Sequence, residues 1–280
     1  MIIDFHTHIF PPSFIEKRED YVRRDATFAT LFSNPRSRLA TAEELVIAIE
    51  EARVDMAVVM GIGWTAKDMA MEANDYIIQS VKRFPGRLVG LCSVNPTWGE
   101  DAVREVERCA EEGLRGIGEL HPDTQGFDLD RREVMALLME AACGLGLVVL
   151  AHSSEPVGHL YPGKGRTTPD KLYAFIRNFP ENTIVCAHWG GGLPFYTLMP
   201  EVAEALSNVY YDTAASPFLY RPEIFPAVVG LSGSDRILFG TDFPLVRHSR
   251  LLKQVEGASL THEARVNILG RNAQALLGLP

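Results

Sequence analysis

Short apolar segments recur along the whole chain and alternate with stretches of helical periodicity. Several of these segments are almost continuous in Val, Ile and Leu, as expected for strands that are covered on both faces. Eight segments are predicted to be strands, over residues 1–5, 54–60, 88–94, 114–118, 147–151, 183–187, 208–211 and 236–239. The alternation predicts a βα unit that is repeated eight times.

Helix signals lie between the predicted strands. In residues 41–52, Thr41 and Glu44 have the spacing of a capping box, in which each side chain binds the backbone N–H of the other residue. Thr168 and Pro169 are predicted to be the N-cap and the first position of another helix. Further helices are predicted in the residues before Pro85, over 101–112 and over about 131–143.

The repeated strand-helix order predicts an α/β fold. Consecutive strands joined by helices are parallel, with right-handed crossovers, and eight units in about 250 residues are typical of a TIM barrel. We expect one barrel domain over residues 1–280, with irregular stretches at 10–40 and 153–167 that lie over the carboxyl ends of the strands. The alternative is a doubly wound open sheet, which usually has a Gly-rich first turn. The barrel is favoured because His6-Thr7-His8 follows the first apolar segment instead.

Residues that commonly bind metal ions stand at the ends of five predicted strands. They are His6 and His8, Glu119, His152, His188 and Asp242. Alternation along a strand places His6 and His8 on the same side, and if that side is the barrel interior, all six converge on one pocket. Imidazoles and carboxylates together suit Zn²⁺, Mn²⁺ or Fe²⁺. Glu119 also allows a structural interpretation, as the ion-pair partner of a neighbouring arginine such as Arg115.

Composition and charge restrict the partners. The chain of 280 residues contains 27 Lys and Arg against 36 Asp and Glu, a formal net charge of −9. This balance argues against non-specific binding to nucleic acid or to an anionic membrane. No apolar segment approaches the roughly 18 residues of a membrane helix, and Met1–His6 does not have the character of a signal peptide. Cys92, Cys109, Cys143 and Cys186 form no C-x-x-C pair and are interpreted as buried free thiols of a cytoplasmic protein.

Basic residues occur in both irregular stretches that we place over the barrel mouth. They are Arg23, Arg24, Arg36 and Arg38 in the first stretch, and Lys164 and Arg166 in the second. Their clustering predicts a small anionic substrate, such as a carboxylate. The alternative is that they are solvated loop charges. The sequence leaves the oligomeric state open, a homo-oligomer included.

Four short motifs resemble the amidohydrolase superfamily, and within it the branch of aminocarboxymuconate-semialdehyde decarboxylase-like proteins. They are Asp4–His8, Ala187–Gly191, Gly240–Pro244 and Leu269–Ala273. The resemblance implies a distorted (β/α)8 TIM barrel with a divalent metal at its carboxyl-terminal mouth. It implies that His6, His8, His152 and Asp242 are metal ligands. His188 corresponds to an acid/base residue in one-metal members and to a ligand in two-metal members.

Glu119 departs from the one-metal decarboxylases of this branch. The run Gly116-Ile117-Gly118-Glu119 is similar to one in TatD-like deoxyribonucleases, in which the Glu bridges two metals. The resemblance therefore implies one or two ions. One ion would be bound by His6, His8, Glu119 and Asp242, and the other by Glu119, His152 and His188. We expect Zn²⁺ first, with Mn²⁺ or Fe²⁺ as alternatives.

These residues predict a metal-dependent hydrolase of a small carboxylate-bearing amide, ester or lactone. A bound metal lowers the pKa of water from about 15.7 towards about 7, so hydroxide is available at neutral pH. Asp242 would accept the water proton and pass it to the leaving group, while the metal or a protonated His188 stabilises the oxyanion. One alternative is a metal-dependent non-oxidative decarboxylase of an unsaturated or aromatic acid. A second is a metal-bound barrel without catalytic activity.

Overall fold

The computed structural model describes all of residues 1–280, and each of the eight predicted segments forms a strand. The strands are β1 (Ile3–His8), β2 (Met56–Met60), β3 (Leu88–Gly90), β4 (Gly116–Leu120), β5 (Val148–Ala151), β6 (Ile184–Cys186), β7 (Val209–Asp212) and β8 (Ile237–Leu238). The bounds differ from the prediction by a few residues. The most consequential difference is in β1, which continues to His8, so that both of its histidines lie within the strand.

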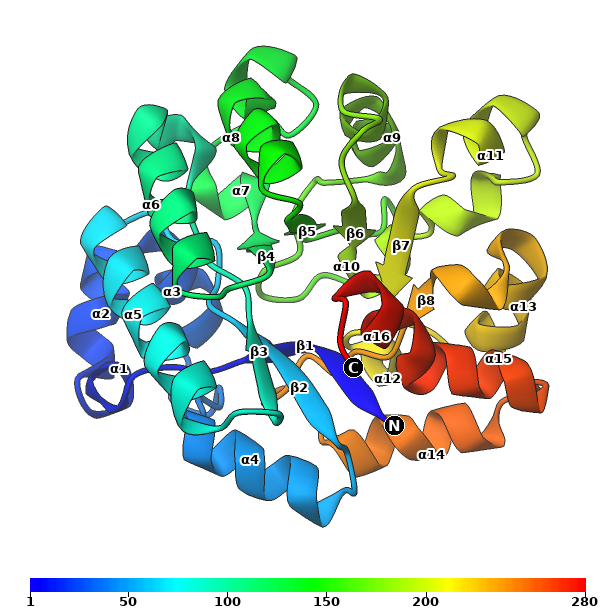
Figure 1. Cartoon of the computed structure of the whole chain (residues 1–280), viewed down its shortest axis with the longest axis horizontal. Coiled ribbons are helices and arrows are strands. Elements are labelled where there is room, and N and C mark those ends of the chain that lie inside the picture. The colour runs from blue at the N-terminus through cyan, green and yellow to red at the C-terminus, as the bar shows by residue number, and fades with distance from the viewer.

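All strand pairs are parallel, and the strands form a closed ring. Hydrogen bonds join β1, β2 and β3 into one sheet and β4 to β8 into another. Two isolated bridges, Thr7 with Phe243 and Cys92 with Ile117, connect these sheets at both of their edges. Figure 1 shows the helices arranged around the outside of the strands. The expected α/β barrel is therefore confirmed, with irregular joins that make it distorted.

Helices follow the strands as the periodicity predicts. The longer helices are α4 (Ala42–Glu51), α5 (Lys67–Arg83), α6 (Glu100–Glu111), α8 (Arg132–Gly144), α9 (Pro169–Asn178), α13 (Ile224–Ser232) and α14 (His248–Gly257). The shorter helices are α1 (Pro12–Glu16), α2 (Arg18–Arg24), α3 (Ala26–Phe32), α7 (Pro122–Gln125), α10 (Ala187–Gly190), α11 (Pro200–Ala205), α12 (Ser216–Leu219), α15 (His262–Val266) and α16 (Asn272–Leu276). The capping box of Thr41 and Glu44 is present at the start of α4, and Thr168 precedes Pro169 as the N-cap of α9.

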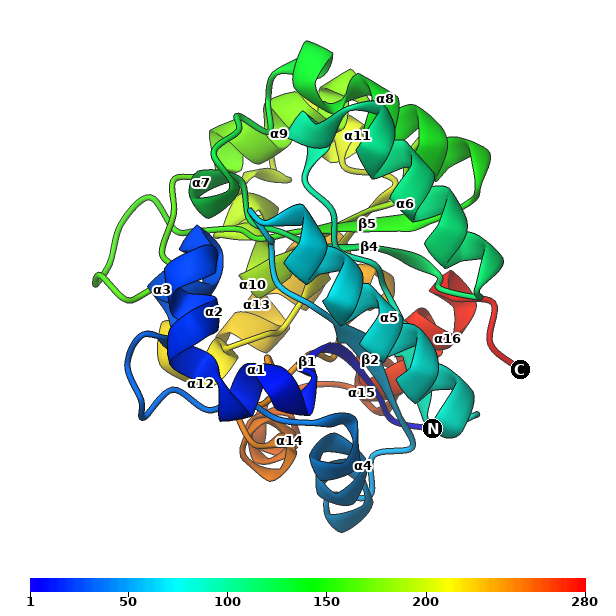
Figure 2. The same cartoon turned by 90° about the vertical axis from the view of Figure 1, so that its left-hand side faces the viewer.

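The expectation of an irregular stretch over residues 10–40 is wrong. This stretch contains α1, α2 and α3, which pack through a cluster of buried aromatic side chains that includes Phe10, Phe14, Phe28 and Trp64. Burial of these large rings is the physical reason for the order, because each ring removes a large apolar surface from water. In Figure 2 these helices lie at one end of the barrel, while both chain termini lie at the other.

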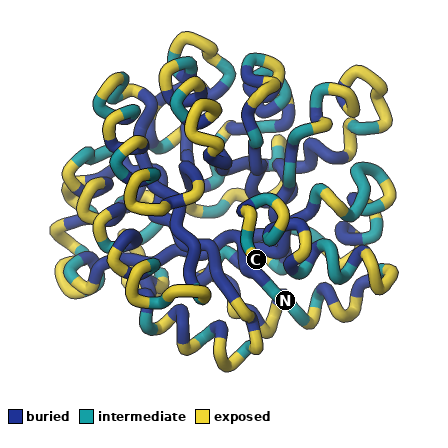
Figure 3. Tube along the Cα trace, viewed as in Figure 1, coloured by how far each residue is buried: buried dark blue, intermediate teal, exposed yellow.

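The strands separate two layers of apolar packing. Figure 3 shows that the strands are buried, whereas the exposed residues lie along the outer helices. The interior layer includes Ile3 and Phe5 of β1 with Val58 and Leu150, and α16 packs against it with Ala273. The outer layer lies between the strands and helices such as α4, α6 and α8. Cys143 lies exposed in α8, so it corrects the expectation that all four cysteines are buried. No helix combines the length and the apolar character that a bilayer crossing requires.

Irregularities in β1 and β4 determine which side chains face the centre of the barrel. Phe5 packs in the interior layer, and regular alternation would turn the next residue, His6, away from it. The register of β1 against β2 shifts between Asp4 and Thr7, and the register of β4 against β5 shifts between Ile117 and Leu120. Bulges of this kind redirect side chains at the rims of barrels. The two register shifts therefore explain why the side chains of His6 and Glu119 both face the centre of the barrel and lie close to each other.

Candidate metal centre

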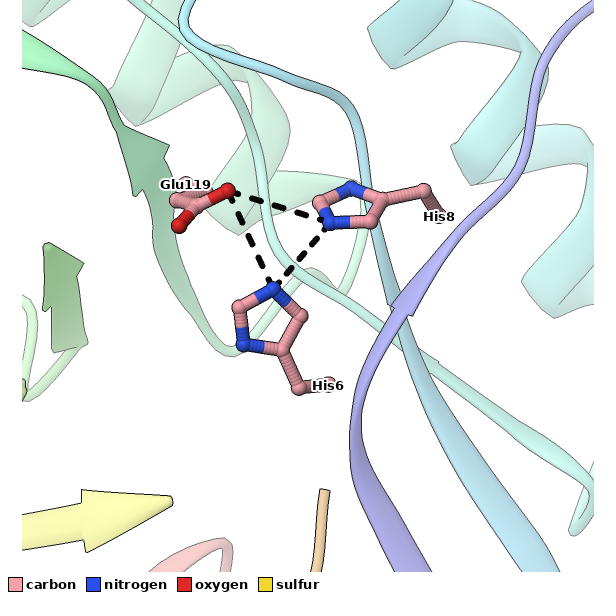
Figure 4. Close-up of side chains that lie close together, drawn as sticks. All are labelled: His6, His8 and Glu119. Atoms are coloured by element: carbon pink, nitrogen blue, oxygen red, sulfur yellow. Dashed lines mark hydrogen bonds and ion pairs between the residues drawn. The ribbon is translucent and has the colours of Figure 1, made fainter. Parts of the chain in front are cut away.

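All six residues that the sequence predicts for the site meet at the carboxyl ends of the strands. His6 and His8 belong to β1, Glu119 to β4 and His188 to α10, while His152 follows β5 and Asp242 follows β8. Asp242 is partly buried, and the other five are buried, with relative exposures of 6% or less. Figure 4 shows His6 and His8 projecting from β1 towards Glu119 on β4. The structure thus brings all six side chains together at one end of the barrel.

One group of ligand atoms surrounds the imidazoles of β1. His6 Nε2 and His8 Nε2 are 3.1 Å apart, and Glu119 Oε2 is 3.8 Å from each of them. Asp242 Oδ1 lies 3.2 Å from His8 Nε2 and 3.9 Å from His6 Nε2. Four potential ligands thus face a common point, and their mixture of nitrogen and oxygen atoms fits Zn²⁺, Mn²⁺ or Fe²⁺.

A second group faces the other oxygen of Glu119. Glu119 Oε1 is 2.9 Å from His152 Nδ1 and 3.5 Å from His188 Nε2. In each of the two groups, Glu119 with His6 and His8 or with His152 and His188, the potential ligand atoms all lie within 4.8 Å of one another. The two oxygens of a single carboxylate therefore face two different pairs of imidazoles, which is the arrangement of one bridging residue between two candidate positions.

The outward-facing nitrogens of these imidazoles are held by other groups. His6 Nδ1 is 2.7 Å from Asp212 Oδ2, His8 Nδ1 is 2.9 Å from the Gly61 carbonyl oxygen, and His188 Nδ1 is 3.1 Å from a backbone carbonyl. Contacts of this kind fix the orientation and tautomer of a metal-binding histidine, because the outer nitrogen carries the proton and the inner one stays free. The structure therefore favours Nε2 of these three histidines as the inward-facing atom.

Asp212 is a residue of the site that the sequence interpretation missed. It ends β7 and is completely buried. Besides its contact with His6, its Oδ1 accepts hydrogen bonds from the backbone N–H groups of His188 and Ala214, at 2.9 and 3.0 Å. The signal was available, because Asp212 directly follows the apolar segment 208–211, just as the other polar residues of the site end their segments.

The charges of the site are strongly coupled. Burial lowers the pKa of His6, but the nearby carboxylates, Asp212 first and then Glu119 and Asp242, together outweigh burial and raise that pKa to about 10. Burial acts in the same direction on His188, and the Glu119 carboxylate raises its pKa to about 9. Burial raises the pKa of Glu119, yet the His152 imidazole holds it well below its usual range. The cluster thus stabilises positive charge, which a divalent cation would supply with neutral histidines as its ligands.

A cavity of about 370 Å³ opens above these groups. His8, Glu119, His152, His188 and Asp242 form one part of its wall. Its apolar part comes from the helices and loops at the mouth, and includes Leu31, Phe32, Ile62, Phe218, Leu219 and Leu245. A cavity of this size, with apolar walls and a few convergent polar groups, is typical of a site for a small organic molecule.

Arg38 is the only one of the six predicted basic residues that lines this cavity. Arg23, Arg24 and Arg166 form ion pairs with acidic neighbours, and Lys164 donates hydrogen bonds to two backbone carbonyls. For those four residues the structure supports the alternative of solvated or paired loop charges. Arg38 is exposed at the cavity mouth and forms no ion pair with this chain.

A comparison with protein-family models gives one match, which spans residues 3–279 and carries the description amidohydrolase. The chain belongs to the amidohydrolase family. Among curated proteins, 2-amino-3-carboxymuconate-6-semialdehyde decarboxylase of Dictyostelium discoideum is 26% identical over an alignment of 332 positions, gaps included, which covers 99% of this chain and 91% of the relative. The gamma-resorcylate decarboxylase of a Polaromonas species is 24% identical and covers 76% of this amidohydrolase and 77% of its own chain.

Solved structures support the same fold. The 5-carboxyvanillate decarboxylase of Sphingomonas paucimobilis superposes with a TM-score of 0.82 at 18% identity, over 100% of this amidohydrolase and 99% of that chain. The resemblance stated from the four sequence motifs is therefore confirmed, and this amidohydrolase is an enzyme. The expected hydrolysis of an amide, ester or lactone is wrong, because the curated relatives are named as decarboxylases. They agree with the first alternative instead.

Proposed function

We propose that this amidohydrolase is a metal-dependent decarboxylase that removes CO₂ from a small aromatic acid. The observation that carries the proposal is the similarity, along almost the whole chain, to a decarboxylase of the same family. It agrees with the cavity, in which an apolar wall faces a buried cluster of imidazoles and carboxylates.

The proposed metal position is the group around β1. His6, His8 and Asp242 would hold the ion together with Glu119, because these four residues present their ligand atoms to one point. His152 and His188 face the other oxygen of Glu119. Together with that carboxylate they form the second group of potential ligands. We propose Mn²⁺ as the ion in place of the zinc that we expected first. Similar decarboxylase structures from Novosphingobium aromaticivorans and a Polaromonas species are described with bound manganese.

The proposed substrate is an aromatic carboxylate. Relatives are named for gamma-resorcylate and 6-methylsalicylic acid, and a similar solved structure contains 2,6-dihydroxybenzoate. In this chain Phe32, Phe218 and other apolar side chains would contact the ring faces. The exposed guanidinium of Arg38 at the mouth would attract the anion from solvent.

Decarboxylation requires a proton at the carbon that carries the carboxylate. The C–C bond to that group then breaks, CO₂ leaves, and the bonding electrons return to the ring. A bound divalent ion supplies positive charge that orients the substrate's oxygen atoms and stabilises negative charge on them. Asp242 at Oδ2, the oxygen not assigned to the ion, and His188 at Nε2 are two groups of this chain that line the cavity and can hold and deliver the proton.

The test is CO₂ release by the purified, Mn²⁺-loaded protein from a panel of hydroxybenzoates that includes 2,6-dihydroxybenzoate and 6-methylsalicylate. We expect CO₂ from at least one member of the panel, in equal amount with the decarboxylated phenol, and none from the metal-free protein. Failure of the loaded protein to release CO₂ from every member would contradict the proposal.

A further inference from the structure

His121 is a buried histidine of the cavity that has no partner in the chain. It follows β4 directly, two residues after Glu119, and both residues line the cavity. The residue is 2% exposed, and neither ring nitrogen has a hydrogen-bond partner. Buried polar groups are nearly always hydrogen-bonded, because an unpaired one loses its contacts with water without replacement. The two free nitrogens of His121 therefore indicate a missing partner.

The position of the ring is fixed by its surroundings. The His121 imidazole stacks on that of His152, with ring centroids 4.1 Å apart and an interplanar angle of 16°. The backbone N–H of His121 donates to Gln125 Oε1 at 2.8 Å, which holds the start of α7 against the strand end. Gly163 also lies beside the ring, since a Cβ atom placed on it would be in van der Waals contact with His121 Nε2, at 3.7 Å.

We infer that His121 is a substrate-binding residue, whose imidazole hydrogen-bonds a hydroxyl group on the ring of the aromatic acid. This inference rests on the proposed decarboxylase function and assigns one substituent of its substrate. His121 lines the same cavity as His152 and Asp242, so a ligand in the cavity reaches all three.

The chemistry of the ring favours a hydroxyl over the reacting carboxylate. A neutral imidazole offers one donor and one acceptor nitrogen, and a hydroxyl group can pair with either of them because it both donates and accepts. A carboxylate can only accept, and stronger positive charge is available to it at the proposed ion. His121 would therefore recognise a ring hydroxyl group of the substrate, whereas the metal centre would bind its carboxylate.

The experiment uses the Mn²⁺-loaded protein and calorimetric titration with two probes that differ only in their hydroxyl groups. One is 2-nitroresorcinol, which is described as an inhibitor of a similar decarboxylase, and the other is nitrobenzene. His121→Phe keeps an aromatic ring against His152 but removes both nitrogens. His262→Phe is the matched control, since His262 is exposed at the start of α15 and does not line the cavity.

We expect the preference of the wild type for 2-nitroresorcinol over nitrobenzene to fall about tenfold in His121→Phe and to stay unchanged in His262→Phe. A purely structural role would lower both affinities alike and leave the preference intact, and that result would overturn the inference while the proposed function stands. A wild type that shows no preference for the hydroxylated probe would overturn the inference together with the proposed substrate class. If His121→Phe does not fold, His121→Leu takes its place with the same expected loss.

Discussion

His6 Nδ1 lies 2.7 Å from Asp212 Oδ2, and both side chains are completely shielded from solvent. The contact connects the last residue of β7 to the middle of β1, past the short strand β8 that lies between them. The other oxygen of Asp212 accepts the backbone N–H of His188, which has a left-handed backbone with a φ of 54°. One carboxylate thus holds two histidines of the site in place without facing the cavity.

Asp212→Asn is expected to weaken metal binding. The amide oxygen is uncharged and accepts a weaker hydrogen bond from the His6 Nδ1–H than a carboxylate does, so the imidazole becomes a less basic and less well oriented ligand. Loss of such a supporting group typically weakens metal affinity by about 10–100-fold. A chelator competition titration with Mn²⁺ measures this, and Asp235→Asn is the control because Asp235 is exposed beside Arg236. Equal Mn²⁺ affinities of the two variants would show that Asp212 does not support metal binding.

Asp242→Asn is expected to retain much of its metal but to lose most of its turnover. The side chain lines the cavity and lies 3.2 Å from His8 Nε2, while the amide cannot deliver a proton. Positioned proton transfer typically contributes about 10²–10⁴-fold to the rate. Initial rates of CO₂ release, compared at equal metal content, measure the effect. A variant as fast as the wild type would exclude Asp242 as the proton-transfer group.

The metal content is expected to be one tightly bound ion per chain. The group around β1 has four ligands, whereas the group of His152 and His188 shares its third ligand, Glu119, with the first. His6→Ala combined with His8→Ala removes two of the four and should abolish tight binding. Elemental analysis after gel filtration gives the ratio of metal to protein. Two tightly bound ions in the wild type, or one in the double variant, would contradict this assignment.

An ion pair of α6 that does not line the cavity, between the buried Glu105 and the partly exposed Arg108, predicts a loss of stability in acid. Burial raises the pKa of Glu105, but hydrogen bonds from Arg108 and Asn74 outweigh it and leave the pKa below the ordinary 4.5. Because the folded state binds this proton less tightly than the unfolded state, the contribution is complete above about pH 4.5 and declines as the pH falls further. The stabilising contribution of the Glu105 charge is thus lost as the pH falls through the pKa that Glu105 has in the folded state.

Glu105→Gln tests this account of acid stability. Charge-assisted hydrogen bonds of this kind contribute about 2 kcal/mol, so the variant should unfold more easily by roughly that amount at pH 7. Urea titrations at several pH values should show the difference in free energy of unfolding shrinking below pH 4.5. A difference that is independent of pH would mean that the charge of Glu105 does not stabilise the fold.

The arrangement of elements was predictable because the strands are covered on both faces. Such strands are almost continuously apolar, so the segment at 147–151 and its counterparts stand out from the helical stretches. The polar residues that interrupt the pattern, His152 and Asp242 among them, stand where the strands end. Parallel strands carry those ends to one side of the barrel, and this is why the members of the site could be named.

The details of the site depend on geometry that periodicity does not contain. The register shifts in β1 and β4 turn His6 and Glu119 inward, and no residue type in those segments indicates where a shift occurs. Asp212 acts through a contact 206 positions away along the chain, so its role follows only from the closed ring. The free charge of Arg38 likewise depends on the absence of an acidic neighbour in space. Fold and site members are thus encoded locally, whereas orientation and pairing are tertiary properties.

The reaction class was the largest error of the sequence interpretation. A metal ion with carboxylates and imidazoles can serve hydrolysis or decarboxylation, since both need a proton-transfer group and stabilisation of negative charge. Asp242 and His188 suit either reaction by residue type alone. The similarity to curated decarboxylases favours decarboxylation, because it extends over 99% of the chain.

The central claim is that residues from distant strands share one cation at the mouth of the barrel. The most direct measurement is an anomalous difference map from crystals of the Mn²⁺-loaded protein, collected above the manganese absorption edge. The account predicts a peak at bonding distance from His6 Nε2, His8 Nε2 and Asp242 Oδ1. A map with no peak among these three atoms, from crystals that contain the metal elsewhere, would contradict it.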